Sequence, residues 1–91
     1  MAKGKFSLIV ALYNVENYVD AFFKSIRLQS YPFKDLDIIV VDDGSSDNSR
    51  NIVESWRSKY PAVIRVFAKS NGGPGSARNV GLNHARNPWI T

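Results

Sequence analysis

The fold is decided by the stretch IIVVDDGSSD, which covers residues 38–47. Its first four residues are apolar and β-branched, a pattern that favours a strand covered on both faces, as in a parallel sheet. The strand then ends in two adjacent aspartates, Asp42 and Asp43, and a glycine. Neighbouring carboxylates repel each other and gain nothing from burial alone. We therefore expect a ligand or partner group at the end of this strand.

Strand and helix patterns alternate on both sides of this stretch. Short apolar runs are followed by segments whose apolar residues recur at the spacing of one helix face. Alternating units with short loops imply parallel strands with right-handed crossovers. The sequence therefore predicts an α/β fold, a Rossmann-like βαβαβα(β) arrangement with a mainly parallel sheet. The predicted strands are residues 6–12, 37–41, 63–68 and 89–91, and the predicted helices lie within residues 14–29, 49–60 and 76–86.

Several side chains of the predicted helices have an expected structural role. Asn14 is the expected N-cap of the first helix, and Glu16 lies in its first turn, where a negative charge favours the helix dipole. For Glu16, a functional role stays open beside this one. Trp56 and the neighbouring residues Phe22 and Phe23 are expected in the core.

The composition limits the class of protein. The chain has 91 residues, no cysteine and a net charge of +4, which fits one small domain without disulfides or thiolate metal sites. The charge suits an anionic ligand or a membrane surface, but the basic residues are scattered without interleaved aromatic residues, which disfavours nucleic acid. No apolar run reaches about 18 residues and no signal peptide is visible, so we expect a soluble chain.

Three polar segments follow the first three predicted strands: residues 13–17, 42–47 and 70–78. In an open parallel sheet the carboxyl ends of the strands meet at one edge, and ligands bind there. The third segment is a glycine loop that opens a helix, which is a site for phosphate, and Arg78 adds a charged fork.

The other two segments suit the remaining parts of a nucleotide. Asp42 and Asp43 fit a group with N–H or O–H donors, such as a base imide or a ribose hydroxyl. The ring of Tyr13 offers a flat face for a base. Base, ribose and pyrophosphate together describe a nucleoside diphosphate. The sequence lacks the Gly-x-x-x-x-Gly-Lys motif of a P-loop, and Arg78 replaces the third glycine of a dinucleotide fingerprint, so NAD is disfavoured.

Three motifs, in this order, resemble the amino-terminal half of a family 2 glycosyltransferase of the GT-A fold. They are VALYNVE at residues 10–16, IVVDDGSSDNS at residues 39–49 and NGGPGSARNVGL at residues 71–82. The resemblance implies inverting transfer of a sugar from a nucleotide donor, usually a UDP-sugar, with a divalent metal, Mg or Mn. Residues 6–91 would then be a truncated nucleotide-sugar-binding half of the domain. Residues 1–5 would be an N-terminal tail, and whether part of this tail was added artificially stays open.

The resemblance also implies donor-binding roles. Tyr13 and Ala11 would line the base, although proline or threonine is common at the position of Ala11. Asp43 would accept a hydrogen bond from the uracil imide, with Asp42 beside it. The remaining residues would approach the base, ribose or diphosphate. The full predicted substrate-binding set is Ala11, Tyr13, Glu16, Asp42, Asp43, Asn71, Gly72 and Arg78.

The family's Asp-x-Asp metal site and catalytic base fall beyond the matched motifs, so we expect no catalytic residue and no metal ligand in this chain. It would be part of a longer, cytoplasmic enzyme that acts at the inner face of a membrane, on a glycan or lipid-linked acceptor of cell-envelope polysaccharide. An exposed apolar sheet edge would favour a homodimer of the fragment.

Two other classes stay open. Adjacent aspartates after an apolar strand also resemble a phosphoacceptor receiver domain, although there the pair ends the first strand and a further aspartate ends the third. A structural or partner-binding domain without activity is the second alternative.

Overall fold

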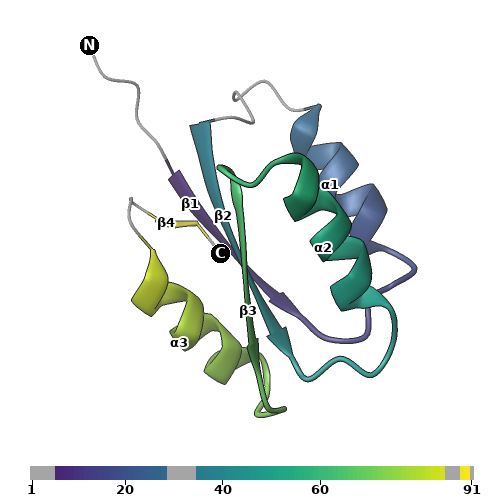
Figure 1. Cartoon of the computed structure of the whole chain (residues 1–91). Helices are drawn as coiled ribbons and strands as arrows, with labels where there is room; N and C mark the ends of the chain where they lie inside the picture. Colours follow the sequence, from purple (N-terminus) through teal and green to yellow (C-terminus); the bar gives the residue numbers. More distant parts are fainter. Residues whose placement is uncertain (1–5, 29–34, 86–88, 91) are drawn as a thin grey trace.

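The computed structural model describes residues 6–28, 35–85 and 89–90, which form one parallel sheet with helices on both faces (Figure 1). The strand order is β3-β2-β1-β4, and every pairing is parallel. The predicted alternation and parallel sheet are confirmed. The elements are β1 (Phe6–Leu12), α1 (Val19–Arg27), β2 (Leu36–Asp43), α2 (Ser49–Lys59), β3 (Ile64–Lys69), α3 (Pro74–His84) and β4 (Trp89–Ile90). The predicted tail at residues 1–5, and positions 29, 86 and 91 at the ends of predicted elements, lie outside the described residues.

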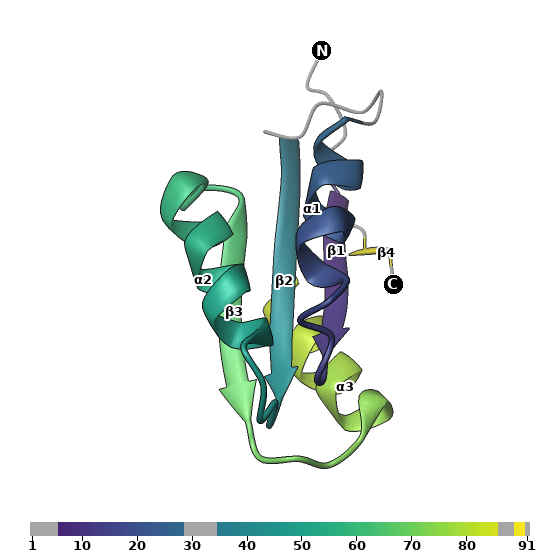
Figure 2. The same cartoon turned by 90° about the vertical axis from the view of Figure 1, so that its right-hand side faces the viewer.

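Strand β2 is the centre of the core. Helices α1 and α2 cover one face of the sheet, and α3 covers the other (Figure 2). Ile38 and Val40 face α1 and α2, whereas Ile39 and Val41 face α3, and all four are 0% exposed. A strand covered on both faces needs an uninterrupted apolar run, which is what the opening stretch provides.

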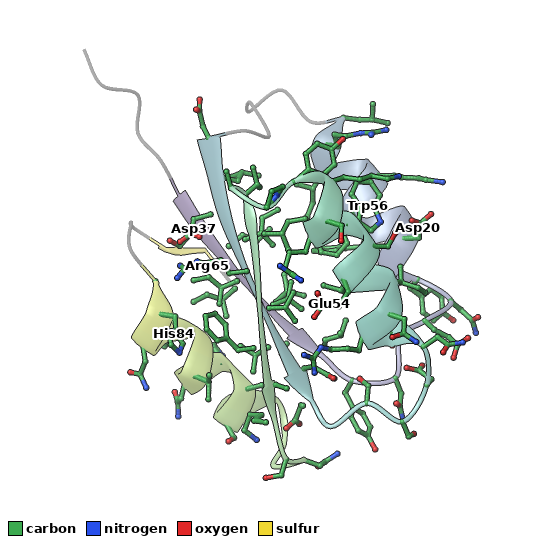
Figure 3. All side chains as sticks on the ribbon, in the orientation of Figure 1. Asp20, Asp37, Glu54, Trp56, Arg65 and His84 are labelled. Carbon is green, nitrogen blue, oxygen red and sulfur yellow. The ribbon has the colours of Figure 1, made fainter. Side chains whose placement is uncertain are left out.

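Helix α1 packs on α2 through aromatic side chains. The rings of Phe23 and Trp56 are stacked with centroids 5.4 Å apart, and Trp56 Nε1 donates a hydrogen bond of 2.8 Å to Asp20 Oδ1 (Figure 3). Both aromatic residues are buried, as predicted. The prediction for Phe22 is wrong, because this residue points away from the core and is 39% exposed.

Helix α3 lies close to the sheet because Gly81 has no side chain. A Cβ at Gly81 would overlap Cγ2 of the buried Ile9 on β1. The far end of α3 is held by Arg65, which donates to the carbonyl oxygen of His84 at 2.8 Å. Arg65 also makes a two-bond pair with Asp37, at 2.7 and 3.0 Å (Figure 3). These contacts fix where α3, and the glycine loop before it, meet the sheet.

The start of the first helix differs from the prediction. Helix α1 begins at Val19, after Tyr18, so Asn14 is not its N-cap and Glu16 is not in its first turn. Asn14 instead adopts the left-handed conformation, with φ of 50°. Its Oδ1 accepts a hydrogen bond of 2.8 Å from the N–H of Ser46, in the loop after β2. This long-range contact replaces the predicted local cap. Over the described part of the chain, each helix is too short or too polar to cross a bilayer.

Candidate functional site

The carboxyl ends of β1 and β2 and the loop after β3 surround a hollow of about 330 Å³. It lies at the edge of the sheet where ligands bind in folds of this kind, beside the point where the strand order reverses between β1 and β4. Four of the predicted binding residues line it, from three separate segments. The lining residues are Ala11, Leu12, Tyr13, Val15, Asp43, Asn71 and Gly73.

Asp43 is held in the hollow by three hydrogen bonds. It is 3% exposed, and its Oδ1 accepts hydrogen bonds of 2.9 Å from Lys69 Nζ and from the N–H of Gly72. Its Oδ2 accepts one from the N–H of Gly73 at 2.8 Å. The Lys69 hydrogen bond first, and the Gly72 N–H second, hold the pKa of Asp43 below its usual value against the opposing effect of burial. The hollow therefore contains an ionised acceptor.

Asp42 lies on the opposite face of the sheet from Asp43, because successive side chains of a strand alternate. Its Oδ1 accepts a hydrogen bond of 3.0 Å from the N–H of Ser45, and its Oδ2 lies 3.9 Å from Arg50 Nη1. Asp42 does not line the hollow. The two carboxylates avoid mutual repulsion by facing apart, and Asp42 has a structural role in the turn.

The segment after β1 is held against the loop after β2 by side chain to backbone hydrogen bonds. The N–H of Val15 donates to Ser49 Oγ at 2.8 Å, and the N–H of Asn14 donates to Ser45 Oγ at 3.1 Å. The N–H of Glu16 donates to Asp47 Oδ2 at 3.2 Å. These bonds fix the position of the neighbouring Tyr13, a residue that is 49% exposed at the rim of the hollow.

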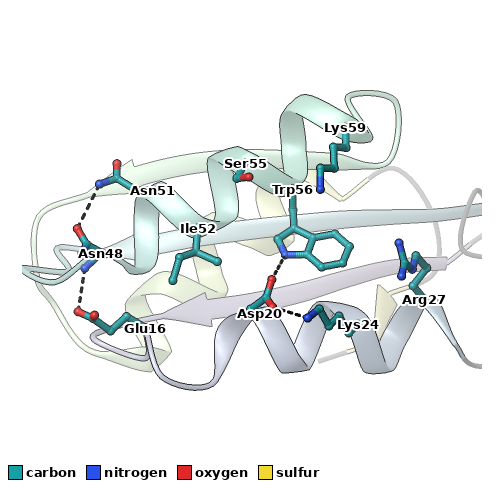
Figure 4. Close-up of a pocket in the computed structure, with 10 residues that line it drawn as sticks. All are labelled: Glu16, Asp20, Lys24, Arg27, Asn48, Asn51, Ile52, Ser55, Trp56 and Lys59. Atoms are coloured by element: carbon teal, nitrogen blue, oxygen red, sulfur yellow. Dashed lines mark hydrogen bonds and ion pairs between the residues drawn. The ribbon is translucent and has the colours of Figure 1, made fainter.

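Glu16 does not reach this hollow. Its Oε1 accepts a hydrogen bond of 3.1 Å from the N–H of Asn48, just before α2 (Figure 4). It lines a second hollow, of about 840 Å³, between α1 and α2. Several polar groups there pair with one another, as with Asp20, which bonds to Trp56 and to Lys24. The observed position of Glu16 supports its structural role.

The glycine loop and α3 complete the rim. The N–H of Gly72 is engaged by Asp43, and Arg78 is exposed on α3 without lining the hollow. Gly73 has φ of 94°, a conformation that other residues rarely adopt, and it is the N-cap of α3. Gly44 has φ of 77°, and a Cβ there would lie 3.0 Å from the backbone nitrogen of Asn71. Glycine thus lets the loops after β2 and β3 touch.

Sequence reasoning missed Lys69, because the third strand was predicted to end one residue earlier. A signal was present, since extending that strand by one residue brings Lys69 opposite Asp43 in the register of β2 and β3. Among the described residues no group of His, Cys, Asp and Glu side chains could hold a metal ion, and Asp42 and Asp43 face apart. These residues therefore do not fit a divalent metal, whose site the resemblance puts beyond the matched motifs.

The comparison with known proteins agrees with this geometry. A sequence model of the family "Glycosyl transferase family 2" matches residues 7–91. The chain belongs to this family. The predicted resemblance is therefore confirmed. The receiver-domain alternative is wrong, because receiver domains have the strand order 2-1-3-4-5, whereas this chain has β3-β2-β1-β4.

Two curated proteins are similar to this chain in sequence. The minor teichoic acid biosynthesis protein GgaA of Bacillus subtilis is 42% identical over 80 residues, which cover 87% of this chain and 18% of GgaA. The poly(ribitol-phosphate) beta-N-acetylglucosaminyltransferase TarS of Staphylococcus aureus is 37% identical over 86 residues, which cover 94% of this chain and 15% of TarS. The family 2 chain thus spans less than a fifth of these curated relatives.

Solved structures of glycosyltransferases show a similar fold. S. aureus TarS residues 1–349 match with a TM-score of 0.82 at 37% identity, covering 94% of this chain and 26% of that one. A mannosyltransferase from Pyrobaculum calidifontis, in complex with GDP-Man and Mn²⁺, matches with a TM-score of 0.82 at 26% identity and the same coverage. The family 2 chain therefore has the fold of the amino-terminal part of GT-A glycosyltransferases, as predicted.

Proposed function

We propose that this chain is the nucleotide-binding part of a glycosyltransferase and that the hollow between β1, β2 and the glycine loop receives the base of a UDP-sugar. The observation that carries the proposal is the meeting of Tyr13, Asp43 and Asn71 at one hollow beside the reversal of strand order. An aromatic face and an ionised acceptor suit a flat ring with an N–H donor. The solved complex of S. aureus TarS with UDP-GlcNAc, which is 40% identical, supports uridine as the base.

The diphosphate would lie toward the start of α3. The N–H groups of Gly72 and Gly73 already bind Asp43, so phosphate contacts would come from the following backbone N–H groups and from Arg78. The exposure of Arg78 leaves its guanidinium available for this contact. Asn71, which lines the hollow, would contact the base or ribose, and Ala11 would contribute backbone contacts. Asp42 and Glu16 would support the loops without touching the donor.

The whole protein would transfer a sugar, with inversion, to a glycan or lipid-linked acceptor. The names of TarS and GgaA point to a polyol-phosphate polymer of the cell envelope as the acceptor class. A divalent metal, Mg or Mn, would be held by residues outside this chain and would stabilise the diphosphate leaving group. The described residues of the chain would bind and orient the donor, and the isolated chain would be inactive.

The same proposal places the whole protein in the cytoplasm, at the inner face of the membrane where lipid-linked acceptors are found. The net charge of +4 favours peripheral contact with an anionic surface. Exposed apolar residues beside β1, including Tyr18 and Phe22, favour dimerisation of the isolated chain. A concentration-independent monomer in sedimentation would contradict the dimer.

Amide NMR of the 91-residue chain tests the binding proposal. UDP is titrated with and without Mg²⁺, with ADP and GDP as controls. Shifts around Tyr13, Asp43 and Asn71 with UDP are the expected result. Tyr13→Ala should weaken UDP binding, whereas Tyr18→Ala, which alters a tyrosine outside this hollow, should not. Equal binding by both variants would remove Tyr13 from the base site, and no response to any nucleotide would favour the interaction-domain alternative.

A further inference from the structure

Lys69 forms an enclosed ion pair beneath the glycine loop. It is the last residue of β3 and lies opposite Asp43 in the sheet register. Its side chain is 17% exposed and that of Asp43 is 5% exposed, with 2.9 Å between Lys69 Nζ and Asp43 Oδ1. The ammonium also donates to the carbonyl oxygen of Ser70. A Cβ at Gly72 would lie only 2.9 Å from Lys69 Nζ, so the loop passes directly over the ammonium.

The hydrogen bonds of Asp43 leave one acceptor position for a ligand. Each oxygen of a carboxylate offers two acceptor positions. Lys69 and the N–H of Gly72 occupy both positions on Oδ1, and the N–H of Gly73 occupies one on Oδ2. Because Asp43 lines the hollow, the second position on Oδ2 is the one that a base can use.

We propose that Lys69 is a positioning residue that sets base specificity, because it fixes Asp43 as an ionised acceptor whose Oδ2 is left for the base. This inference rests on the proposed function. A carboxylate here accepts a hydrogen bond from the ring N–H of uracil. Cytosine has a lone pair at the same ring position, so two acceptors would face each other, which disfavours cytidine nucleotides. Lys69 acts through Asp43 and does not touch the nucleotide.

Among the groups around Asp43, Lys69 is the one that keeps this carboxyl ionised. Tyr13, after β1, lines the same hollow, and Arg78 on α3 is exposed without an ion pair to Asp43. Asp42 is adjacent in β2 but faces the other side of the sheet, toward Arg50. Over the described residues, Lys69 is the cation that pairs with Asp43. Its removal therefore raises the pKa of this carboxyl, since the Lys69 hydrogen bond is the largest cause of the lowered value.

The test is the pH dependence of binding by the 91-residue chain to UDP-N-acetylglucosamine, whose diphosphate diester adds no ionisation in the acidic range. Lys69→Met removes the charge, Lys69→Arg keeps it, and Lys59→Met is the matched control, since Lys59 is exposed on α2 away from the hollow. The wild-type chain, Lys69→Arg and Lys59→Met should bind with constant affinity from pH 7 to about pH 5. For Lys69→Met, the affinity should begin to fall at a higher pH than in the wild-type chain. Below the raised pKa of Asp43 it should fall by about tenfold for each pH unit.

A lysine that only supports the loop would give a different result. Lys69→Met would then weaken binding by the same factor at every pH, and this outcome or an unshifted pH profile would overturn the proposal. If Lys69→Met does not fold, Lys69→Gln keeps a donor to Asp43 but removes the charge, and should show a smaller shift in the same direction. A wild-type chain that binds no nucleotide refutes the proposed function itself. A binding chain whose Asp43 carboxyl carbon titrates identically in the wild type and in Lys69→Gln refutes only the role of Lys69.

Discussion

The close approach of α3 to the sheet predicts opposite effects of one chemical change at two glycines of the same helix. A Cβ at Gly75 meets no atom within 4 Å, whereas a Cβ at Gly81 overlaps Ile9 Cγ2. Glycine to alanine in a helix gains about 1 kcal/mol of stability. Gly75→Ala should therefore stabilise the chain by up to about 1 kcal/mol, or raise Tm by about 4–8 °C.

At Gly81 the same gain is outweighed by overpacking. Ile9 is 5% exposed and part of the core beneath α3, where side chains are closely packed. Forcing an extra methyl into such a core costs about 1–3 kcal/mol, and an overlapping contact lies at the upper end of that range. Subtracting the gain in helix propensity leaves a net loss of about 2 kcal/mol, which lowers Tm by about 8–16 °C.

Thermal and urea unfolding followed by circular dichroism measure both variants. Ile9→Leu removes Cγ2 at nearly constant volume, so the double variant Gly81→Ala with Ile9→Leu should recover at least 1 kcal/mol relative to additivity. In the single variant, amide signals of Gly72 and Gly73 should shift, because α3 carries the loop that binds Asp43. If Gly81→Ala is as stabilising as Gly75→Ala, the packing of α3 described above is wrong.

Three further predictions concern the core, the phosphate contact and pH. Phe23→Ala should lower the free energy of unfolding by about 3–5 kcal/mol and leave the chain largely unfolded in urea titrations. Phe22→Ala, at a residue 39% exposed, should lower it by under about 1 kcal/mol. Equal losses of stability in the two variants would contradict the orientation of α1. Arg78→Gln should weaken the binding of UDP about 10- to 100-fold and leave the binding of uridine unchanged. If calorimetry shows that the affinities for UDP and uridine fall by the same factor, Arg78 does not contact the phosphate. The pKa values of Asp43 and Asp20 in the folded chain lie below their usual values, chiefly through hydrogen bonds from Lys69 to Asp43 and from Trp56 to Asp20. The stability that these two carboxylates give the fold is complete above about pH 4 and is lost as the pH falls through their pKa values in the folded chain. Unfolding free energies that stay constant from pH 6 to about pH 3 would contradict the effect of these hydrogen bonds.

The fold could be predicted because its central strand carries a local signal. Four β-branched residues in succession predict a strand covered on both faces, and residues 38–41 are each 0% exposed on β2. The start of α1 could not be predicted in the same way. Asn14 resembles a local cap, but its side chain bonds to Ser46, 32 positions away in the sequence. A contact of this length leaves no periodic pattern near either residue.

In the candidate site too, positions set by the order of the strands could be predicted, and positions set by long-range contacts could not. Tyr13 and Asn71 reach one hollow because parallel topology places the strand ends together, which sequence order predicts. Asp42 was grouped with Asp43, although the two-residue period of a strand already indicates opposite faces. The position of Glu16 depends on the N–H of Asn48, a partner supplied only by the docking of α1 against α2.

The central claim is that uracil lies against Tyr13 with its ring N–H directed to Asp43. The most direct measurement is a set of intermolecular nuclear Overhauser effects between bound UDP and the labelled chain. The account predicts cross-peaks from the uracil H5 and H6 protons to the ring of Tyr13 and to the methyl groups of Leu12 or Val15, which line the same hollow. Cross-peaks from uracil to Trp56 or Ile52 in the groove between α1 and α2, with none to Tyr13, would contradict it.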